Sequence, residues 1–322
     1  MPSNLLNVLP QNSQAKHSPG LKPQASRINQ AEAYFERKWL IDAESMMPNG
    51  SIREMNRIER SWEAILEIFG NDLSSLQVVD IGCGSGELVK RLHKAGARVL
   101  AVDIALNALK HLPSGIPQKQ DALPDTRLFD DFYDLVICTD VIADLAVPQH
   151  RLCMSELYRL LKPDAWVMIS TSLDSEGEGA LESFIDLIST EFKELRIVLS
   201  DHHWHRKVEK ILEQANTLKQ YCNEPEKRLK SQKIKGKFFY FITHPKLKSF
   251  WSFINYCVSP AKKLFSTNKT ILLKLEKFCR FWRGNRASSH VITLGRRKTM
   301  MDRLEEKEKI DQRLSLGITE PS

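Results

Sequence analysis

The chain has 322 residues and a net charge of +7, with 42% hydrophobic and 27% charged residues. These values are ordinary for a globular protein, and no apolar run approaches the roughly 20 residues that a membrane-spanning helix needs. The six cysteines are scattered without a C-x-x-C pair, which argues against a zinc ribbon or a disulfide framework and favours a cytoplasmic protein.

Charge and composition divide the chain into regions. The first thirty residues are rich in Gln, Asn, Ser and Pro, which predicts a disordered tail. From 205 to 288, twenty Lys and Arg accompany five Asp and Glu, a net charge of +15, so the rest of the chain carries −8. Such asymmetry indicates an anionic partner or surface. We expect a tail over 1–30, a main domain over 31–203 and 289–300, a basic insertion over 204–288 and a charged tail over 301–322.

Hydrophobic periodicity predicts alternating helices and strands. In chain order these are helices over 30–40 and 52–69, a strand over 77–81, a helix over 85–94, a strand over 98–102, a helix over 107–112, a strand over 134–138, a helix over 150–161, a strand over 166–171, a helix over 180–192 and a strand over 195–200. Helical periodicity then dominates to about residue 283, before a last strand over 290–294. Nearly all-apolar strands that alternate with helices indicate an α/β fold with a parallel sheet covered on both faces.

A glycine-rich loop joins the first of these strands to its helix. It reads Val78-Val79-Asp80-Ile81-Gly82-Cys83-Gly84-Ser85-Gly86, and its glycines let the backbone turn tightly and approach a ligand closely. Asp103 ends the next strand, where an acid can accept hydrogen bonds from a ribose diol. The D-x-G-x-G-x-G spacing differs from the dinucleotide pattern G-x-G-x-x-G, which argues against a bound pyrophosphate.

These motifs, over roughly residues 75–175 and the last strand, resemble those of class I methyltransferases, and within them the ubiquinone-type O-methyltransferases. The resemblance implies a Rossmann-like seven-stranded sheet, with a helical insertion before the last strand, and S-adenosyl-L-methionine as cofactor. The glycine loop would lie against the amino acid part of the cofactor, Asp80 near its ammonium group and Asp103 at its ribose. The expected cofactor-binding residues are Asp80, Gly82, Cys83, Gly84, Gly86, Asp103, Asp121, Ala122 and Thr139, of which Asp121 and Ala122 would meet the adenine.

Two motifs of that family are altered here. Leu160-Leu161-Lys162-Pro163-Asp164-Ala165 is similar to its L-K-P-G-G turn, with both glycines replaced. The fourth strand ends in Cys138-Thr139-Asp140-Val141-Ile142-Ala143-Asp144, where the family often has C-x-E-V-L-E-H. Asp140 therefore keeps an acid, and Asp144 stands at the family's histidine.

Methyl transfer to a hydroxyl needs a base, and ligands of this fold bind at the carboxyl ends of strands. The candidates are Asp140 and Asp144 after the fourth strand, and Asp201, His202, His203 and His205 after the sixth. A metal site at the histidines is disfavoured, because adjacent strand residues point to opposite faces and no cysteine accompanies them; we expect no metal. The sequence lacks N-P-P-Y, D-P-P-Y and Pro-Cys after the fourth strand, which argues against adenine-N6, glutamine-N5 and base-C5 methylation.

The basic insertion interleaves lysines with aromatic clusters at 238–241, 250–253 and 278–282. The sheet topology of the family would place it over the mouth of the active site. It is interpreted as a lid that also contacts an anionic membrane, with Trp251 and Trp282 as anchors, as a lid alone, or, less favoured, as a binding surface for single-stranded RNA.

The predicted function is S-adenosylmethionine-dependent methyl transfer to an oxygen of a hydrophobic small molecule or lipid-like acceptor. The alternative is a non-catalytic S-adenosylmethionine-binding protein that docks on an anionic membrane or on RNA through the insertion. A cytoplasmic location is expected in either case, with association to a membrane surface left open.

Overall fold

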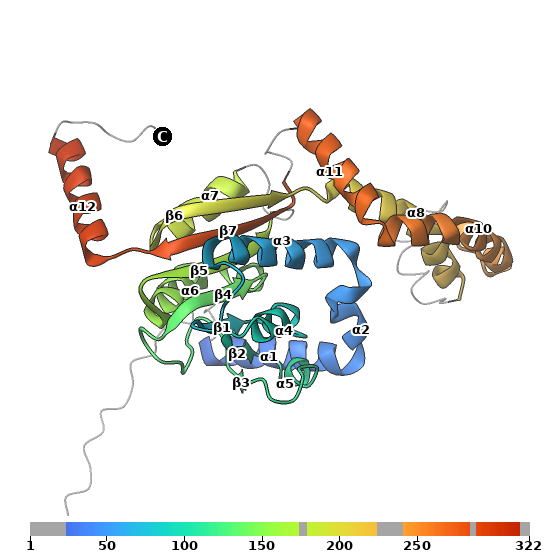
Figure 1. Ribbon diagram of the computed structural model, residues 1–322. Coiled ribbons are helices and arrows are strands. Elements are labelled where there is room, and N and C mark those ends of the chain that lie inside the picture. The colour runs from blue at the N-terminus through green and yellow to red at the C-terminus, as the bar shows by residue number, and fades with distance from the viewer. Residues whose placement is uncertain (1–23, 174–178, 224–240, 284–287, 316–322) are drawn as a thin grey trace, which may run out of the picture.

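A computed structural model describes residues 24–173, 179–223, 241–283 and 288–315. Its centre is one seven-stranded sheet in the order β3-β2-β1-β4-β5-β7-β6 (Figure 1). The strands are β1 (Gln77–Ile81), β2 (Arg98–Asp103), β3 (Gln118–Gln120), β4 (Tyr133–Thr139), β5 (Leu161–Ser172), β6 (Phe192–Ser200) and β7 (His290–Arg297). β7 runs antiparallel to β5 and β6, while the pairs among β1 to β5 are parallel. The predicted α/β fold with its methyltransferase-type sheet is confirmed.

Helices cover both faces of the sheet, as the nearly all-apolar strands require. One face packs against α6 (Val147–Leu160) and α7 (Ala180–Ser189) through a core that includes Val136, Leu157 and Phe184. The other packs against α3 (Ile52–Phe69) and α4 (Glu87–Lys94) through a core that includes Ile65, Val89 and Leu135.

The N-terminal segment folds back over the carboxyl edge of the sheet as α1 (Gln24–Ile41), α2 (Ala43–Met46) and η1 (Pro48–Gly50). The Glu36 carboxylate fastens α1 to the short helix α5 (Leu106–Leu109), because it accepts hydrogen bonds from the backbone N–H of Leu106 at 2.6 Å and of Asn107 at 3.0 Å. The predicted tail over 1–30 overlaps α1, and residues 1–23 lie outside the described part of the chain.

The insertion is helical, as its periodicity predicts. Its described helices are α8 (His203–Asn223), η3 (Pro245–Leu247), α10 (Lys248–Thr267) and α11 (Lys269–Arg283). α8 and α10 pack on each other and project from the sheet, and α11 lies against α3 (Figure 1). The last helix is α12 (Met300–Ser315). Across the described ranges, no helix combines the length and the apolar content needed to cross a bilayer.

Several element boundaries differ from the predicted ones, and the boundary between α7 and β6 differs for a local reason. Phe192 belongs to β6 rather than to the preceding helix, because its buried ring and its pairing with Arg297 place it in the sheet. The strand was predicted over 195–200, and only its first three residues were missed; an irregularity lies there, since the register shifts between Lys193 and Arg196 and Glu194 has a positive φ of 52°. Asp164, which replaces a family glycine, likewise adopts a positive φ of 58°.

Candidate active site

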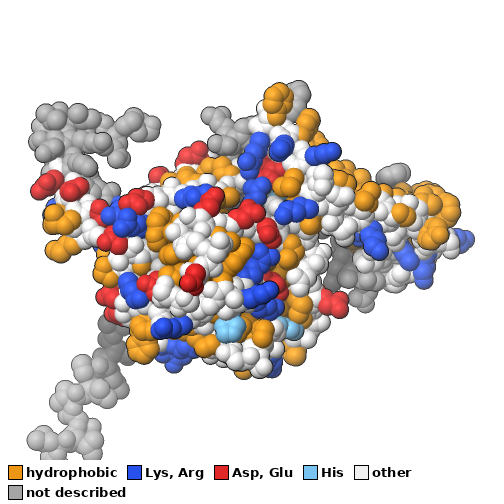
Figure 2. Space-filling model, in the orientation of Figure 1, with side chains coloured by type: hydrophobic (Ala, Val, Ile, Leu, Met, Phe, Trp, Pro, Cys, Tyr) orange, Lys and Arg blue, Asp and Glu red, His pale blue; other side chains and the backbone are white. Residues whose placement is uncertain are grey.

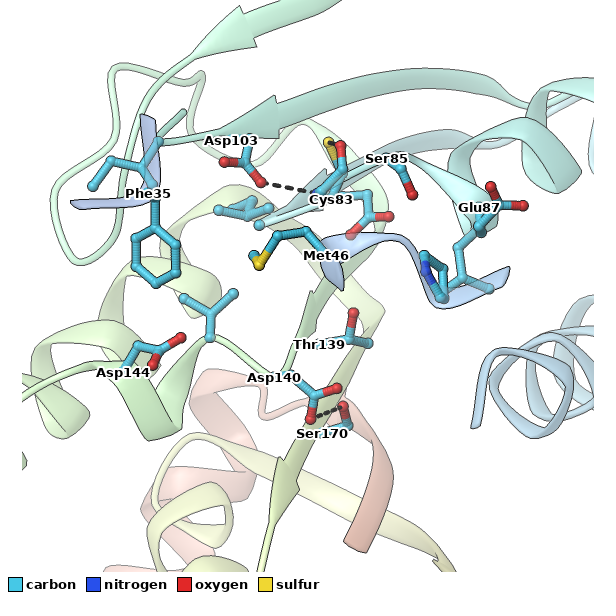
Figure 3. Close-up of a pocket in the computed structure, with 18 of the residues that line it drawn as sticks. Phe35, Met46, Cys83, Ser85, Glu87, Asp103, Thr139, Asp140, Asp144 and Ser170 are labelled. Carbon is cyan, nitrogen blue, oxygen red and sulfur yellow. Dashed lines mark hydrogen bonds between the residues drawn. The ribbon is translucent and has the colours of Figure 1, made fainter. Parts of the chain in front are cut away.

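A cavity of about 460 Å³ lies at the edge of the sheet where β1, β2 and β4 end and β7 begins (Figure 3). The carboxyl ends of parallel strands meet at one edge, which is where ligands bind in such sheets. The N-terminal helices contribute to the cavity wall, with Phe35 and Trp39 of α1 and Met46 of α2. From the sequence, Phe35 and Trp39 were predicted only to lie in a helix over 30–40, and Met46 lay in no predicted element.

The glycine loop forms the cavity floor. Gly82 and Gly84 have φ values of 79° and 54°, a backbone conformation that glycine adopts without strain. A Cβ on Gly82 would lie 2.2 Å from Cγ2 of Val141, so only glycine fits there. Gly86 does not line the cavity; it precedes α4, and its backbone lies against Leu112.

Two buried acids lie behind this loop. Asp103 accepts hydrogen bonds from the N–H groups of Gly84 at 2.9 Å and of Ala105 at 2.8 Å. The side chain of Asp80 is 2% exposed and its Oδ1 has no hydrogen-bond partner. Burial, helped by the charge of Asp103, raises the pKa of Asp80 to about 7. A buried carboxylate oxygen without a partner fits an incoming cation, so the site suits the ammonium group expected at Asp80.

Asp121, Ala122 and Thr139 also line the cavity. Asp121 is fixed by the Lys119 ammonium at 2.9 Å and by the Arg127 N–H at 2.9 Å. Although burial opposes ionisation, these contacts lower the pKa of Asp121. Of the nine expected cofactor-binding residues, the structure brings eight to this cavity, and Gly86 lies beside it.

The far end of the cavity holds a fixed carboxylate. Asp140 has a positive φ of 60°, and its Oδ1 lies 2.8 Å from Nε2 of His290 while its Oδ2 lies 3.0 Å from Nη2 of Arg57. The Ser170 hydroxyl donates to Oδ1 at 3.4 Å. Burial opposes ionisation, but the His290 and Arg57 pairs lower the pKa of Asp140 to about 2. Asp140 is therefore an ionised group at neutral pH.

Asp144 lies at the same end, on the 3-10 turn η2 (Ile142–Asp144) that follows β4 (Figure 3). Partial burial raises its pKa, the positive charge of Lys38 opposes this, and the negative charge of Asp140 adds to it. The two neighbouring carboxylates are thus shifted in opposite directions.

The three candidate histidines at the start of the insertion lie outside this cavity. None of His202, His203 and His205 is in the wall of this cavity. Burial and nearby cations lower the pKa of His202 to about 2, and its Nε2 lies 3.2 Å from Nδ2 of Asn56. His205 stacks on Phe265 and contacts the Phe265 carbonyl at 3.1 Å, which is a packing role. Asp201, also outside the wall, caps α8 by accepting from the His203 N–H at 3.0 Å.

The insertion does not cover the cavity mouth in the ranges that the structure describes, contrary to the sequence-based expectation, since no residue of its described helices is in the wall. The physical reason is that α11 is anchored on α3 at Arg60, next to the end of β6. Glu276 of α11 is buried and binds Arg60 of α3 at 2.6 Å, which draws the helices away from the mouth.

His290 and Arg57 are functional candidates that sequence reasoning missed. His290 starts the last strand and lies 150 positions from Asp140 in the sequence, so no local pattern links them. Arg57 lies on the polar side of α3, and the prediction of that helix used only the spacing of its apolar residues.

The comparisons with known proteins agree with this geometry. A family model described as "Methyltransferase domain" matches residues 53–224, more than half of the chain. A ubiquinone biosynthesis O-methyltransferase of Bordetella bronchiseptica is 30% identical over 164 residues, which cover 48% of this chain and 64% of that protein. One of Leptothrix cholodnii is 28% identical over 145 residues, covering 42% and 57%. The chain thus spans less than two thirds of the curated relatives' length.

Among solved structures, the similarity is more distant. A SAM-dependent methyltransferase from Archaeoglobus fulgidus aligns with a TM-score of 0.42 and 10% identity, over 74% of this chain and 94% of that one. The N-methyltransferase NodS from Bradyrhizobium japonicum, in complex with S-adenosyl-L-homocysteine, aligns with a TM-score of 0.39 and 16% identity, over 54% and 88%. The family match, the strand order and the glycine loop together show that this chain belongs to the S-adenosylmethionine-dependent methyltransferase family.

Proposed function

We propose that this protein transfers the methyl group of S-adenosylmethionine to an oxygen of a hydrophobic small molecule or lipid-like acceptor. The observation that carries the proposal is one cavity that joins the glycine loop to two carboxylates with oppositely shifted pKa values. When the surroundings shift the pKa values of two neighbouring titratable groups in opposite directions, one group can act as a proton acceptor while the other keeps its charge. The similarity to ubiquinone biosynthesis O-methyltransferases supports oxygen as the acceptor atom.

The chain's own residues would bind and orient the reactants. The cofactor supplies an electrophilic methyl group when it is bound. Gly82 and Gly84 would let the backbone approach its amino acid part, Asp80 would hold its ammonium group, and Asp103 would accept hydrogen bonds from its ribose hydroxyls. Apolar side chains in the wall, including Phe35 and Met46, exclude water and suit a hydrophobic acceptor.

The two carboxylates would divide the work on the acceptor hydroxyl. Asp144, whose pKa is raised, is the better proton acceptor, because a base works best when its pKa is near the working pH. Asp140 stays ionised between His290 and Arg57 and would orient the hydroxyl by accepting its hydrogen bond. His202, His203 and His205 have no direct part in this scheme.

A surface on α10 supports an anionic membrane as a partner. Phe250, Phe253, Tyr256 and Leu264 share one face of the helix and are 52%, 63%, 78% and 58% exposed. The helix contains no acid and carries Lys248, Lys262 and Lys263. Figure 2 shows apolar side chains gathered at the end of the projecting helices. An apolar aromatic face flanked by lysines suits an anionic bilayer surface.

The residues that would anchor the insertion in a membrane differ from Trp251 and Trp282, which the sequence led us to expect. The Trp251 ring is half-buried and its indole N–H donates to the Ile242 carbonyl at 2.7 Å, so it faces the protein. The Trp282 side chain and residues 238–240 lie outside the described part of the chain. Phe253 and Tyr256 take the place of the two tryptophans as anchors.

Turnover is the test that separates an enzyme from a non-catalytic binding protein. Purified protein is incubated with methyl-labelled cofactor and catechols of increasing chain length, and S-adenosylhomocysteine and labelled ether are measured. Asp144→Asn should lower the rate by about 10²–10⁴-fold while cofactor affinity survives, and Asp125→Asn, an exposed acid outside the cavity, is the control. Cofactor binding without any labelled product would contradict the proposal.

Membrane binding is tested separately by co-sedimentation with vesicles. Wild-type protein should bind vesicles with anionic lipid, bind neutral ones weakly, and be released by salt. Phe253→Ser with Tyr256→Ser should abolish binding, whereas Phe129→Ser, equally exposed but outside the insertion, should retain it. Retention of single-stranded RNA without vesicle binding would instead favour a nucleic-acid role.

A further inference from the structure

Lys38 is a cation in the wall of the active-site cavity that takes no part in holding the cofactor or Asp140. It lies on α1, three residues after Phe35, and both side chains line the cavity. Positions three apart on a helix lie on the same side of it, and Figure 3 shows Phe35 on the side of the cavity where Asp144 lies. Lys38 therefore belongs to the end of the cavity assigned to the acceptor.

The ammonium group of Lys38 is not tied to a carboxylate. Its Nζ atom lies 5.3 Å from the centre of the Tyr34 ring, and among the described residues it forms no ion pair. The other cation of the described wall is Arg57, which already binds Asp140 and Glu54. Lys38 is half-buried, so water screens its charge only in part. Of these two cations, Lys38 is the one whose N–H donors are available to a ligand.

Lys38 also acts on the proposed base. Its positive charge opposes the rise in the pKa of Asp144 that partial burial causes, so the two side chains lie within electrostatic reach of each other. The other charged or titratable side chains of the wall at this end are Tyr34, Glu54, Arg57, Asp140 and His290. Both α5 and α2 pack against α1; the first has no titratable side chain, and the second has Glu44. Lys38 is thus coupled to the side chain that would take the proton.

Proton transfer to Asp144 changes which negative charge Lys38 faces. When the acceptor hydroxyl gives its proton to the Asp144 carboxylate, that carboxyl group becomes neutral and the negative charge passes to the acceptor oxygen. A fixed cation stabilises a developing oxyanion most where water is excluded, and Phe35 and Met46 supply apolar wall. The oxygen then bonds to the methyl carbon, the carbon–sulfur bond breaks with its electron pair on sulfur, and the proton leaves Asp144 for solvent.

We propose that Lys38 is a further catalytic residue, whose ammonium group donates a hydrogen bond to the acceptor oxygen and stabilises its ionised form. This inference rests on the proposed methyl transfer. It divides the activation of the acceptor between two groups: Asp144 takes the proton, and Lys38 holds the oxygen that the proton leaves. Acceptors whose hydroxyl ionises readily should depend on Lys38 least.

The ionisation of a bound phenol can be measured without turnover. 4-Nitrocatechol changes its visible absorbance when its first hydroxyl ionises, so it can be titrated in the complex with S-adenosylhomocysteine. Lys38→Met and Lys38→Gln remove the charge, and Lys38→Arg keeps it. Arg37→Gln is the matched control, because Arg37 is an exposed cation on the same helix outside the cavity wall. Thermal denaturation checks that each variant is folded.

Removing the charge should lower the ionisation constant of the bound probe about tenfold, the effect of one charge-assisted hydrogen bond. Lys38→Arg should restore it, and Arg37→Gln should match wild type. The difference should persist when Asp144→Asn is added, because Lys38 then acts on the probe and not through that carboxylate. Failure of the probe to bind, equal ionisation constants in wild type and in Lys38→Met and Lys38→Gln, or a difference that disappears with Asp144→Asn would overturn the proposal.

Turnover gives a second readout, from catechols of different acidity. Lys38→Met should lower kcat for catechol by about 10–100-fold, since a half-buried cation contributes less than a fully enclosed donor, and should affect 4-nitrocatechol much less. An equal loss for both acceptors would indicate a structural role and overturn the proposal. A probe ionisation that depends on Lys38, without methylation of any catechol by wild type, would refute the proposed methyl transfer but support an oxyanion site at Lys38.

Discussion

Lowering the pH should weaken S-adenosylmethionine binding, because Asp80 must be ionised to hold the ammonium group. Burial and the charge of Asp103 raise the pKa of Asp80 to about 7. A ligand ammonium beside the carboxylate favours its ionised form and lowers that pKa again. Below pH 7 the free protein carries a neutral carboxyl group, whose proton must leave when the ligand binds. Near pH 8 almost no proton has to leave the carboxyl group, so binding is tighter there than at pH 6.

The magnitude follows from the pKa of the free protein. Each pH unit below about 7 costs about 1.4 kcal/mol of binding free energy, as long as the bound form stays ionised. The dissociation constant should therefore rise about tenfold between pH 8 and pH 6, and about a hundredfold between pH 8 and pH 5. Close to one proton should be released per ligand bound at pH 6.

Calorimetry at constant ionic strength, in two buffers with different ionisation heats, measures both quantities. 5′-Methylthioadenosine, which lacks the ammonium group, should bind with little dependence on pH in this range. Asp80→Asn should bind S-adenosylmethionine more weakly at pH 8 and lose the slope, while Asp125→Asn should behave as wild type. A dissociation constant that is the same at pH 8 and pH 6, or an equal slope for 5′-methylthioadenosine, would refute the role given to Asp80.

Three further substitutions test the surroundings of the site. His290→Gln should lower the methylation rate about tenfold and move the acidic limb of its pH profile upward, because loss of the His290 pair raises the pKa of Asp140; an unmoved limb would contradict this. Trp39→Ala should cost about 3–5 kcal/mol of unfolding free energy, measured by urea denaturation, and should loosen the glycine loop against which the ring packs, seen as weaker cofactor binding. Glu276→Gln should destabilise by about 3 kcal/mol, since Arg60 then loses its buried partner; an unchanged midpoint would show that the pair contributes nothing.

The cofactor half of the site could be predicted from the sequence because its chemistry is local. Asp80, Gly82 and Gly84 lie within five consecutive residues, and Asp103 ends the next strand. The spacing of such residues is fixed by one strand-turn-helix unit, so the pattern alone indicates their placement. Asp140 and Asp144 could be found for the same reason, as they follow the end of a strongly apolar strand.

The partners of those acids could not be predicted, because they come from distant parts of the chain. Arg57 lies on an N-terminal helix and His290 on the last strand, and only the antiparallel insertion of β7 beside β5 brings His290 to Asp140. The histidines after the sixth strand gave the opposite error, because the sequence pattern made them candidate bases and the structure places them outside the cavity wall. His202 and His205 appear chemically rich in the sequence, but the first is held neutral by burial and cations, and the second packs on Phe265.

The helix α3 shows why the insertion cannot be treated as a separate unit. Arg53, Arg57 and Arg60 lie on one stripe of that helix, at positions i, i+4 and i+7. Arg53 binds Glu209 of α8, Arg57 binds Asp140 of the catalytic edge, and Arg60 binds Glu276 of α11. Three successive turns of one helix therefore bind both the insertion and Asp140, the acid that we propose orients the acceptor.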